Sequence, residues 1–389
     1  MAGEGAAAGA AALDAAVAAV AAAVGLAEGR AGVLDVLREI ARAEPVPVRE
    51  VSRAVGIPVP IVAAICNELR GQGLVERAQP VQLTARGRAE VGGAPPHPAG
   101  CPHCGGTGTA IPPELADLAA ELTTLADSMP AAKVELDQTH CTVQTKLRRV
   151  LLLDEAGALA GKRVLVLGDD DLTSLALRAY AARTGRRADV TVLDVDPDLL
   201  AFLRGHGVDA VEHDARAPLP AALTGAYDIV CTDPPYTVAG AELFLSRAAA
   251  ALRPEVGAHV FFSFGARRPA ETVAVQTIIA GMGLAIRAVL PGWNTYTGAG
   301  ILAGTSTLWH LRTAAPTTPT ITGTYEGPLY TADGRAGLAR PYKCADCKAV
   351  WPVGPGQRWA RIADLQAAGC PDCGGSTFRP QSLHSGRTR

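Results

Sequence analysis

The sequence predicts an α/β protein whose largest part is an open, mostly parallel sheet with helices on both faces. Seven short apolar runs rich in Val, Leu, Ile and Phe occur between Arg163 and Arg312. Ala- and Leu-rich helical stretches separate the first five runs, which is typical of strands joined by helical crossovers. The chain has 389 residues, more than one ordinary core needs, so smaller domains are expected at its ends.

Composition restricts the possible functions. The chain has 36 Lys and Arg against 38 Asp and Glu, so it lacks the positive charge that would attract nucleic acid or an anionic membrane. Residues 1–30 are Ala-rich and contain Glu4 and Asp14, unlike a signal peptide with a basic start. We predict that they form a loosely helical or disordered tail, and that the protein is cytoplasmic without a membrane span.

Residues 31–91 are predicted to form a winged helix-turn-helix domain. The patterns predict helices at 34–44, at 48–56 and from residue 57 to Gly71 or Gly73, and then a wing with a short helix at 75–91. The third helix, which would enter the major groove of DNA, is rich in Ile, Val and Ala, and the charges of Glu68 and Arg70 cancel. DNA recognition needs basic and polar side chains there, so we expect packing or dimerisation instead.

A Pro- and Gly-rich linker, residues 92–113, is expected to follow. It contains Cys101 and Cys104, and the candidates to complete a metal site with them are His97, His103 and Cys141. The catalytic domain, residues 114–314, then begins with a helical stretch that contains the sequence ELDQTH.

The predicted strands of this domain are 163–168, 188–196, 209–214, 227–233, 258–265, 284–290 and 305–312. The last two are joined by the loop PGWNTYTGAG without a helix, which favours an antiparallel end to the sheet. This arrangement resembles the Rossmann-like sheet of class I methyltransferases. Trp293 and Tyr296 of the loop are candidates to close over a substrate, with loop packing as the alternative.

Carboxylates recur where these strands end. The acids are Asp169, Asp170 and Asp171 after the first strand, Asp194 and Asp196 at the second, Asp214 at the third and Asp233 at the fourth. Ligands of parallel sheets bind at this edge. Gly168 starts the first turn, Asp194 is placed to accept hydrogen bonds from a ribose diol, and Asp214 to hold an adenine amino group. A solvated loop carboxylate is the alternative for each.

The segment TDPPYT, residues 232–237, is the most specific local signal. Asp-Pro-Pro followed by an aromatic residue is typical of enzymes that alkylate an exocyclic amino nitrogen. The prolines stiffen the turn, and Pro234 is a candidate donor contact. Asp233 can accept a hydrogen bond and a proton from the attacking amine, while the ring of Tyr236 can lie against a flat base or a cationic amine.

Three aspartates fill the turn LGDDDLTS, where nucleotide-binding folds usually have glycine. They would repel the carboxylate of S-adenosylmethionine, whereas decarboxylated S-adenosylmethionine ends in an aminopropyl ammonium. Coulomb terms on the order of a few kcal/mol favour the decarboxylated donor and a polyamine acceptor. A solvated acidic turn at a helix start is the alternative.

These motifs, the preceding LDQ and the N-terminal domain together resemble the N4-bis(aminopropyl)spermidine synthase family over roughly residues 33–312. The resemblance implies transfer of aminopropyl groups from decarboxylated S-adenosylmethionine to the internal amine of spermidine, with methylthioadenosine released. It implies that the three aspartates hold the donor chain or the acceptor, one of them as base, and that Asp233 orients or deprotonates the nucleophile. Tyr236, Asp137 and Gln138 would contact the acceptor.

The chain departs from that family after its catalytic domain. A Thr- and Pro-rich linker, residues 315–340, leads to a module at 341–380. Its cysteines are Cys344, Cys347, Cys370 and Cys373. Their spacing predicts a zinc ribbon with a four-thiolate, and therefore structural, zinc ion. Such a module can recruit a macromolecule or cover the active site, which leaves the identity of the acceptor open.

Two other functions remain alternatives. One is a methyltransferase that uses S-adenosylmethionine on an amino group of nucleic acid or protein, but the turn lacks the usual glycines. The other is a transcription regulator with a degenerate enzyme domain, which the apolar third helix and the complete acid set disfavour. We also expect a homodimer, through the winged-helix domain.

Overall fold

The computed structural model describes residues 2–91, 101, 104, 106–298, 304–314, 316–330, 333, 340–353, 357–359 and 362–380. The chain divides into two compact units, one comprising 1–132 with 138–325 and the other 133–137 with 326–389. The large sheet and the N-terminal helices belong to the first unit, and the four-cysteine module belongs to the second.

The N-terminal region is helical. Its helices are α1 (Ala2–Val24), α2 (Gly29–Ala43), α3 (Val48–Val55), α4 (Val59–Gly71) and α5 (Ala85–Val91). Isolated antiparallel bridges join Val46 to Val81 and Val75 to Leu83 at the position expected for the wing. The apolar residues of α4 point into the core of this region, where Val62 and Ile65 are fully buried, so α4 is used for packing. Assignment as a winged helix stays a prediction.

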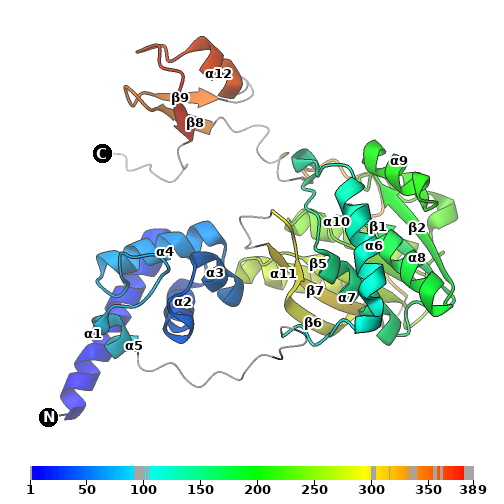
Figure 1. The fold of residues 1–389 in the computed structure, drawn as a ribbon, viewed down its shortest axis with the longest axis horizontal. Coiled ribbons are helices and arrows are strands. Elements are labelled where there is room, and N and C mark those ends of the chain that lie inside the picture. The colour runs from blue at the N-terminus through cyan, green and yellow to red at the C-terminus, as the bar shows by residue number, and fades with distance from the viewer. Residues whose placement is uncertain are drawn as a thin grey trace. The chain divides into compact units, whose positions relative to one another are not determined.

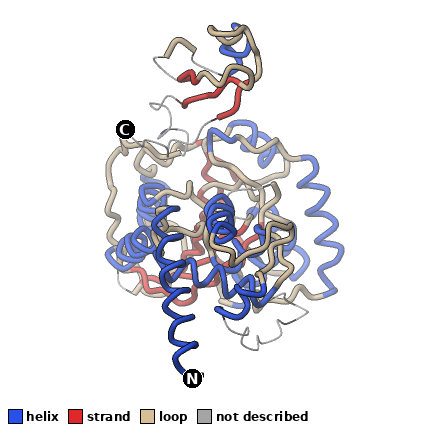
Figure 2. Tube along the Cα trace, turned by 90° about the vertical axis from the view of Figure 1, so that its left-hand side faces the viewer, coloured by secondary structure: helices blue, strands red, loops and turns tan. Residues whose placement is uncertain are grey.

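The first helix, α1, lies in residues 1–30, for which the sequence predicts a loosely helical or disordered tail. α1 is continuous (Figure 2), and Ala16, Val17, Val20 and Ala21 form a buried stripe that packs with α2 and α4. Alanine is weakly apolar, so the composition of this segment does not predict a buried face. The burial of that face depends largely on Val17 and Val20. In the part of the chain that the structure describes, no single helix is long and apolar enough to cross a membrane. Residues Leu13–Val24 of α1 and the helix α2, bent by 109° relative to each other, meet the length and composition criteria only as a pair.

The large sheet has the strand order β3-β2-β1-β4-β5-β7-β6. Its strands are β1 (Lys162–Leu167), β2 (Ala188–Asp194), β3 (Asp209–Glu212), β4 (Ile229–Thr232), β5 (His259–Phe264), β6 (Leu284–Thr295) and β7 (Thr305–Thr313). β1 to β5 pair in parallel, and β7 is antiparallel to both β5 and β6. The predicted mostly parallel sheet with an antiparallel end is confirmed. One detail differs: β6 continues to Thr295 through an irregularity after Leu290, so residues 291–295 are strand rather than loop.

Helices cover the sheet. They are α6 (Ala116–Ser128), α7 (Val143–Glu155), α8 (Thr173–Thr184), α9 (Pro197–Gly205), α10 (Val238–Ala251) and α11 (Pro269–Gly281). α6, α7 and α8 contact one another and lie together in Figure 1. Alternate residues of β1, Val164 and Val166, pack into one core with Val150 of α7 and Leu177 of α8, as the two-residue period of a strand requires.

The strand order brings the acid-bearing turns together. β2, β1 and β4 are neighbours, so the turns after them share one edge of the sheet. Gly168 takes a left-handed conformation with φ of +78°, and Leu172, a non-glycine residue with φ of +53°, precedes α8 in the same region. A buried leucine in this conformation is held there by its surroundings, and such strain is concentrated at functional sites.

The first part of the predicted linker 315–340 contacts α10. Arg247 of α10 is 1% exposed and donates hydrogen bonds to the carbonyls of Ile321 and Gly323. Thr317 Oγ1 also donates to Ala249 O at 2.8 Å. Residues 316–325 therefore pack on the catalytic domain, because a buried guanidinium with several donors can satisfy the carbonyls of an irregular segment.

The second unit contains a small three-stranded sheet. β8 (Arg340–Cys344) pairs antiparallel with both β9 (Val350–Val353) and β10 (Phe378–Pro380), and α12 (Ile362–Ala368) lies between β9 and β10 in the chain. Val353, Trp359, Leu365 and Phe378 form its core with two of the cysteines.

Candidate active site

The three aspartates of the β1 turn have three different surroundings. Asp169 is fully buried and accepts hydrogen bonds from the backbone N–H and the hydroxyl of Ser174, the latter at 2.5 Å. Burial raises the pKa of Asp169 to about 7, against the hydrogen bonds from Ser174. Its side chain ties the turn to the start of α8.

Asp171 is 3% exposed and is held by positive charge. Its Oδ2 accepts from Arg149 Nη1 at 2.6 Å, and its Oδ1 accepts from the backbone N–H of Cys141 at 2.5 Å. Burial alone would raise the pKa of Asp171, but Arg149 and Lys146 outweigh it, and the pKa lies below its ordinary value. Asp171 is therefore a carboxylate in this site.

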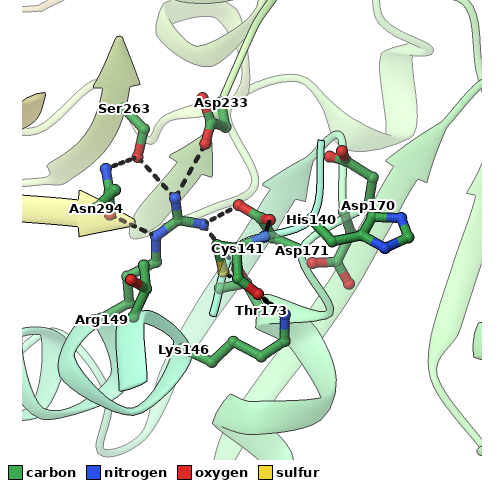
Figure 3. Close-up of polar contacts among 12 residues, drawn as sticks. His140, Cys141, Lys146, Arg149, Asp170, Asp171, Thr173, Asp233, Ser263 and Asn294 are labelled. Atoms are coloured by element: carbon green, nitrogen blue, oxygen red, sulfur yellow. Dashed lines mark hydrogen bonds and ion pairs between the residues drawn. The ribbon is translucent and has the colours of Figure 1, made fainter. Parts of the chain in front are cut away.

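Asp170 is the most accessible carboxyl of the three. It is half-buried, and its Oδ2 accepts a hydrogen bond from the backbone N–H of Thr139 at 3.0 Å. Figure 3 shows it with His140, whereas the dashed contacts of Arg149 reach Asp171 and Asp233. Burial, followed by the negative charges of Asp171 and Asp233, raises the pKa of Asp170 well above its ordinary value. A carboxyl of this kind readily takes up a proton.

Asp233 lies opposite this turn, after β4. Its Oδ1 accepts from the hydroxyl of Tyr236 at 3.0 Å, and its Oδ2 accepts from the hydroxyl of Tyr296 at 2.5 Å and from Arg149 at 3.0 Å. Burial raises the pKa of Asp233 to about 6, with Arg149 opposing and Asp171 reinforcing the shift. The side chain of Thr237 caps the start of α10 by accepting from Gly240 N, which fixes the turn that carries Asp233.

A segment from before α7 covers the acids. Gln138 Nε2 donates to Asp196 Oδ2 at 3.0 Å, and the backbone N–H groups of Thr139 and Cys141 donate to the β1 turn as described above. Lys146, fully buried, donates to Cys141 O at 2.9 Å. The LDQ motif therefore contributes Gln138 to the same edge of the sheet as the acids.

The predicted donor-binding residues occupy the expected edge. Asp194 is 8% exposed and accepts from the backbone N–H groups of Asp169 and Asp196, so it joins the turns after β1 and β2. Asp214, more exposed, accepts from Arg216 N at 2.9 Å. Gly168 lines a pocket together with Asp171 and Asp233, and Pro234 is buried beside Asp233.

Two other predicted residues have different outcomes. Asp137, directly before Gln138, has a left-handed backbone conformation with φ of +56°, and its contact with an acceptor stays a prediction. Trp293 does not close over the cleft: it is 1% exposed, belongs to the main core and donates from Nε1 to Thr107 O at 3.0 Å. Tyr296, its neighbour in the predicted loop, does reach the site through Asp233.

Sequence reasoning missed Arg149 and Lys146. Both lie in TKLRRVLLLDE, where basic residues on a helix usually belong to a solvated face. Here they are 7% and 0% exposed. A signal was present, because Arg149 interrupts an apolar stretch that has to face the sheet.

The four cysteines of the second unit meet at one point. One Sγ atom from each lies within 4.8 Å of the others, and the Cys344–Cys373 and Cys347–Cys370 sulfur pairs are 3.6 and 3.5 Å apart. Four ligands around zinc, each with a Zn–S distance of about 2.3 Å, require separations of just under 4 Å, so the donor set fits a tetrahedral ion. The other predicted cysteine pair, Cys101 and Cys104, is described, but its candidate partners His97 and His103 lie outside the described residues. The third candidate, Cys141, is buried beside Asp171, and a metal site with it stays a prediction.

Comparison with known proteins assigns the family. Residues 117–322, more than half of the chain, match the family model described as the branched-chain polyamine synthase A C-terminal domain. The chain belongs to this family. An uncharacterized protein of Methanocaldococcus jannaschii is 31% identical over 90% of this chain and 89% of its own.

Two similar proteins have names that state an activity. N(4)-bis(aminopropyl)spermidine synthase of Thermus thermophilus is 35% identical over 58% of this chain and 71% of its own. The branched-chain polyamine synthase of T. thermophilus, solved with N4-aminopropylspermidine and 5′-methylthioadenosine, has a TM-score of 0.69 and 28% identity, covering 83% of this chain and 98% of that one. The fold predicted for the catalytic domain is thus found in the synthase itself.

Proposed function

We propose that this protein is an aminopropyltransferase that makes branched polyamines. It transfers aminopropyl groups from decarboxylated S-adenosylmethionine to an internal amine of spermidine or a similar polyamine. The observation that carries this proposal is the composition of the sheet edge, where the carboxyls of Asp170 and Asp233 lie on adjoining turns. The relatives named as synthases support it.

The cations of the site support the decarboxylated donor. Arg149 donates to Asp171 and Asp233, and Lys146 donates to the backbone of the covering segment. The carboxylate of ordinary S-adenosylmethionine would have to compete with Asp171 and Asp233 for Arg149. An ammonium at the same place would instead be attracted by Asp170.

The size of this preference follows from Coulomb's law. Two unit charges about 4 Å apart interact by about 4 kcal/mol at an effective dielectric constant of about 20. Asp170 is half-buried, so solvent screening reduces this value. We expect the decarboxylated donor to bind about 10- to 100-fold more tightly than its carboxylated parent.

The reaction needs a proton acceptor and an oriented nucleophile. The acceptor nitrogen, once neutral, attacks the methylene carbon next to the sulfonium, the C–S bond breaks, and its electron pair leaves with methylthioadenosine. Asp170 takes the proton of the acceptor ammonium, since it has a raised pKa and an accessible position. Asp233, fixed by Tyr236 and Tyr296, holds the amine in line with the carbon, so that positioning supplies much of the rate.

One assay tests the proposal. The purified protein is incubated with spermidine and either donor, and methylthioadenosine, adenosylhomocysteine and polyamines are followed by mass spectrometry. We expect methylthioadenosine and a branched polyamine with the decarboxylated donor. Adenosylhomocysteine formed from S-adenosylmethionine, without methylthioadenosine, would indicate a methyltransferase instead.

A pair of variants tests the assigned carboxyl. Asp170→Asn should lower turnover by about 100-fold or more, because general base catalysis contributes about 10²- to 10⁴-fold. Asp189→Asn is the matched control: Asp189 is 75% exposed at the start of β2, at the opposite edge of the sheet. Equal rates in both variants would remove Asp170 from the mechanism.

The second unit has a structural role in this proposal. Its four thiolates would hold one zinc ion with no open coordination position, so the metal would stabilise the module and take no part in transfer. Metal analysis of the purified protein should find about one zinc per chain. A homodimer, expected from the sequence, is checked by sedimentation velocity.

A further inference from the structure

Arg149 joins the separate parts of the acidic edge. Its three nitrogen atoms make hydrogen bonds to Asp171 and Thr173 beside β1, Asp233 after β4, Ser263 in β5, and Asn294 and Tyr296 at the end of β6. Figure 3 shows the guanidinium between Asp171 on one side and Asp233, Ser263 and Asn294 on the other. A single side chain thus sets the spacing between the turn after β1, which carries the three aspartates, and the turn after β4, which carries Asp233.

The presence of this cation needs a reason. A fixed positive charge opposes the binding of a cationic donor and a cationic acceptor at the same edge. It is also costly to desolvate, and Arg149 is only 7% exposed. The planar guanidinium can bridge two carboxylates at defined angles, which a lysine ammonium cannot do. Arg149 therefore serves to orient Asp171 and Asp233 and to keep them ionised, at the cost of a weaker attraction for cationic substrates.

We propose that Arg149 is a positioning residue of the transfer reaction. It fixes Asp171 and Asp233 as charged, oriented carboxylates and so leaves Asp170 as the carboxyl that exchanges a proton with the acceptor amine. This inference rests on the proposed function. It assigns different tasks to carboxyls that the sequence presents as equivalent.

The surroundings of each carboxyl agree with these tasks. Charged and titratable groups face Asp171 and Asp233 from several elements. They are Arg149 and Lys146 of α7, His140 and Cys141 of the covering segment, Asp169 and Asp170 of the β1 turn, Tyr236 and Tyr296. Arg149 opposes the effect of burial on the pKa of both Asp171 and Asp233. The pKa of Asp170, which has no direct bond to Arg149 among the described contacts, is raised instead.

Two substitutions separate charge from geometry. Arg149→Gln removes the charge, so the pKa values of Asp171 and Asp233 should rise and the acid limb of the kcat profile should move to higher pH. Arg149→Lys keeps the positive charge but loses the simultaneous hydrogen bonds to Asp171 and Asp233. It should leave the acid limb near its wild-type position while lowering kcat by about 100-fold, as expected from misplacement of about 1 Å, with a smaller change in KM.

Arg148→Lys is the matched control on the same helix. Arg148 donates to Trp293 O and lies over the Trp293 ring, outside the acid cluster. It should keep the wild-type pH profile and a kcat within about threefold of wild type. Thermal unfolding of each variant shows whether it is folded.

The outcomes are decisive in either direction. If Arg149→Gln is folded and its acid limb matches that of wild type, the inference is wrong. If Arg149→Gln does not fold, Arg149→Lys decides: a wild-type kcat, or a loss that appears only in KM, overturns it. Failure of the wild-type protein to release methylthioadenosine would instead refute the proposed function, so the two failures are distinguishable.

Discussion

Replacing Tyr296 with phenylalanine tests whether Asp233 acts as a carboxylate during transfer. The hydroxyl of Tyr296 donates to Asp233 Oδ2 at 2.5 Å, and the hydroxyl of Tyr236 donates to Oδ1 at 3.0 Å. Both bonds stabilise the ionised form of Asp233. Burial nevertheless raises its pKa to about 6. Loss of one donor should raise this pKa further.

The size of the change can be worked from the contact. A hydrogen bond to a charged group contributes about 1.5 to 3 kcal/mol, and a change of one in pKa corresponds to about 1.4 kcal/mol. The pKa of Asp233 should therefore rise from about 6 to about 7 or 8 in Tyr296→Phe. Asp233 orients the amine only above its pKa. Activity that the wild type loses as the pH falls through about 6 should then be lost about one to two pH units higher.

The assay is the initial rate of methylthioadenosine release at saturating substrates, measured between about pH 5 and 10. Tyr180→Phe is the control, because the Tyr180 hydroxyl donates to Asp154 Oδ2 at 2.7 Å away from the acids. It should reproduce the wild-type profile. A Tyr296→Phe profile whose acid limb coincides with that of wild type would show that the ionisation of Asp233 does not govern the reaction.

Three further predictions concern the rest of the chain. Val17→Ala removes two buried methyl groups from α1 and should lower the free energy of unfolding, measured by denaturant titration, by about 2 kcal/mol. Val24 is only half-buried, so Val24→Ala should lower it by less. Equal, negligible losses in both variants would favour a loose tail. Cys347→Ser should release zinc measured by elemental analysis, while the exposed Ser376→Ala should retain it; unchanged zinc content would place the metal elsewhere. Arg247→Met should speed limited proteolysis at 316–325, because buried carbonyls lose their donor, and an unchanged cleavage rate would contradict the role of Arg247.

Strands and acids were predictable from sequence for a common physical reason. Buried parallel strands are continuous apolar runs, and their ends are marked by polar residues such as Asp169 and Asp233. Helical crossovers then force neighbouring strand ends onto one edge. That the acids form one cluster follows from topology, without knowledge of any side-chain contact.

The division of tasks among the acids was not predictable. Asp169, Asp170 and Asp171 are identical in the sequence, and their surroundings come from Ser174, Thr139 and Arg149. Two of these partners lie more than twenty residues away, so local pattern contains no information about them. The same limit applies to Arg149, whose burial depends on how α7 packs beside the sheet.

The partners of each carboxyl determine which of the three aspartates is available to a substrate. Asp171, paired with Arg149, contributes little net charge towards the cleft, and Asp169 is turned towards Ser174. In the proposed mechanism, Asp170 is the carboxyl that an incoming amine meets first. In the proposed reaction a secondary ammonium can donate N–H to Asp170, whereas a nitrogen alkylated until no N–H remains is held by charge alone. Asp170 would then bind the substrate amine more strongly than such a product, which favours product release.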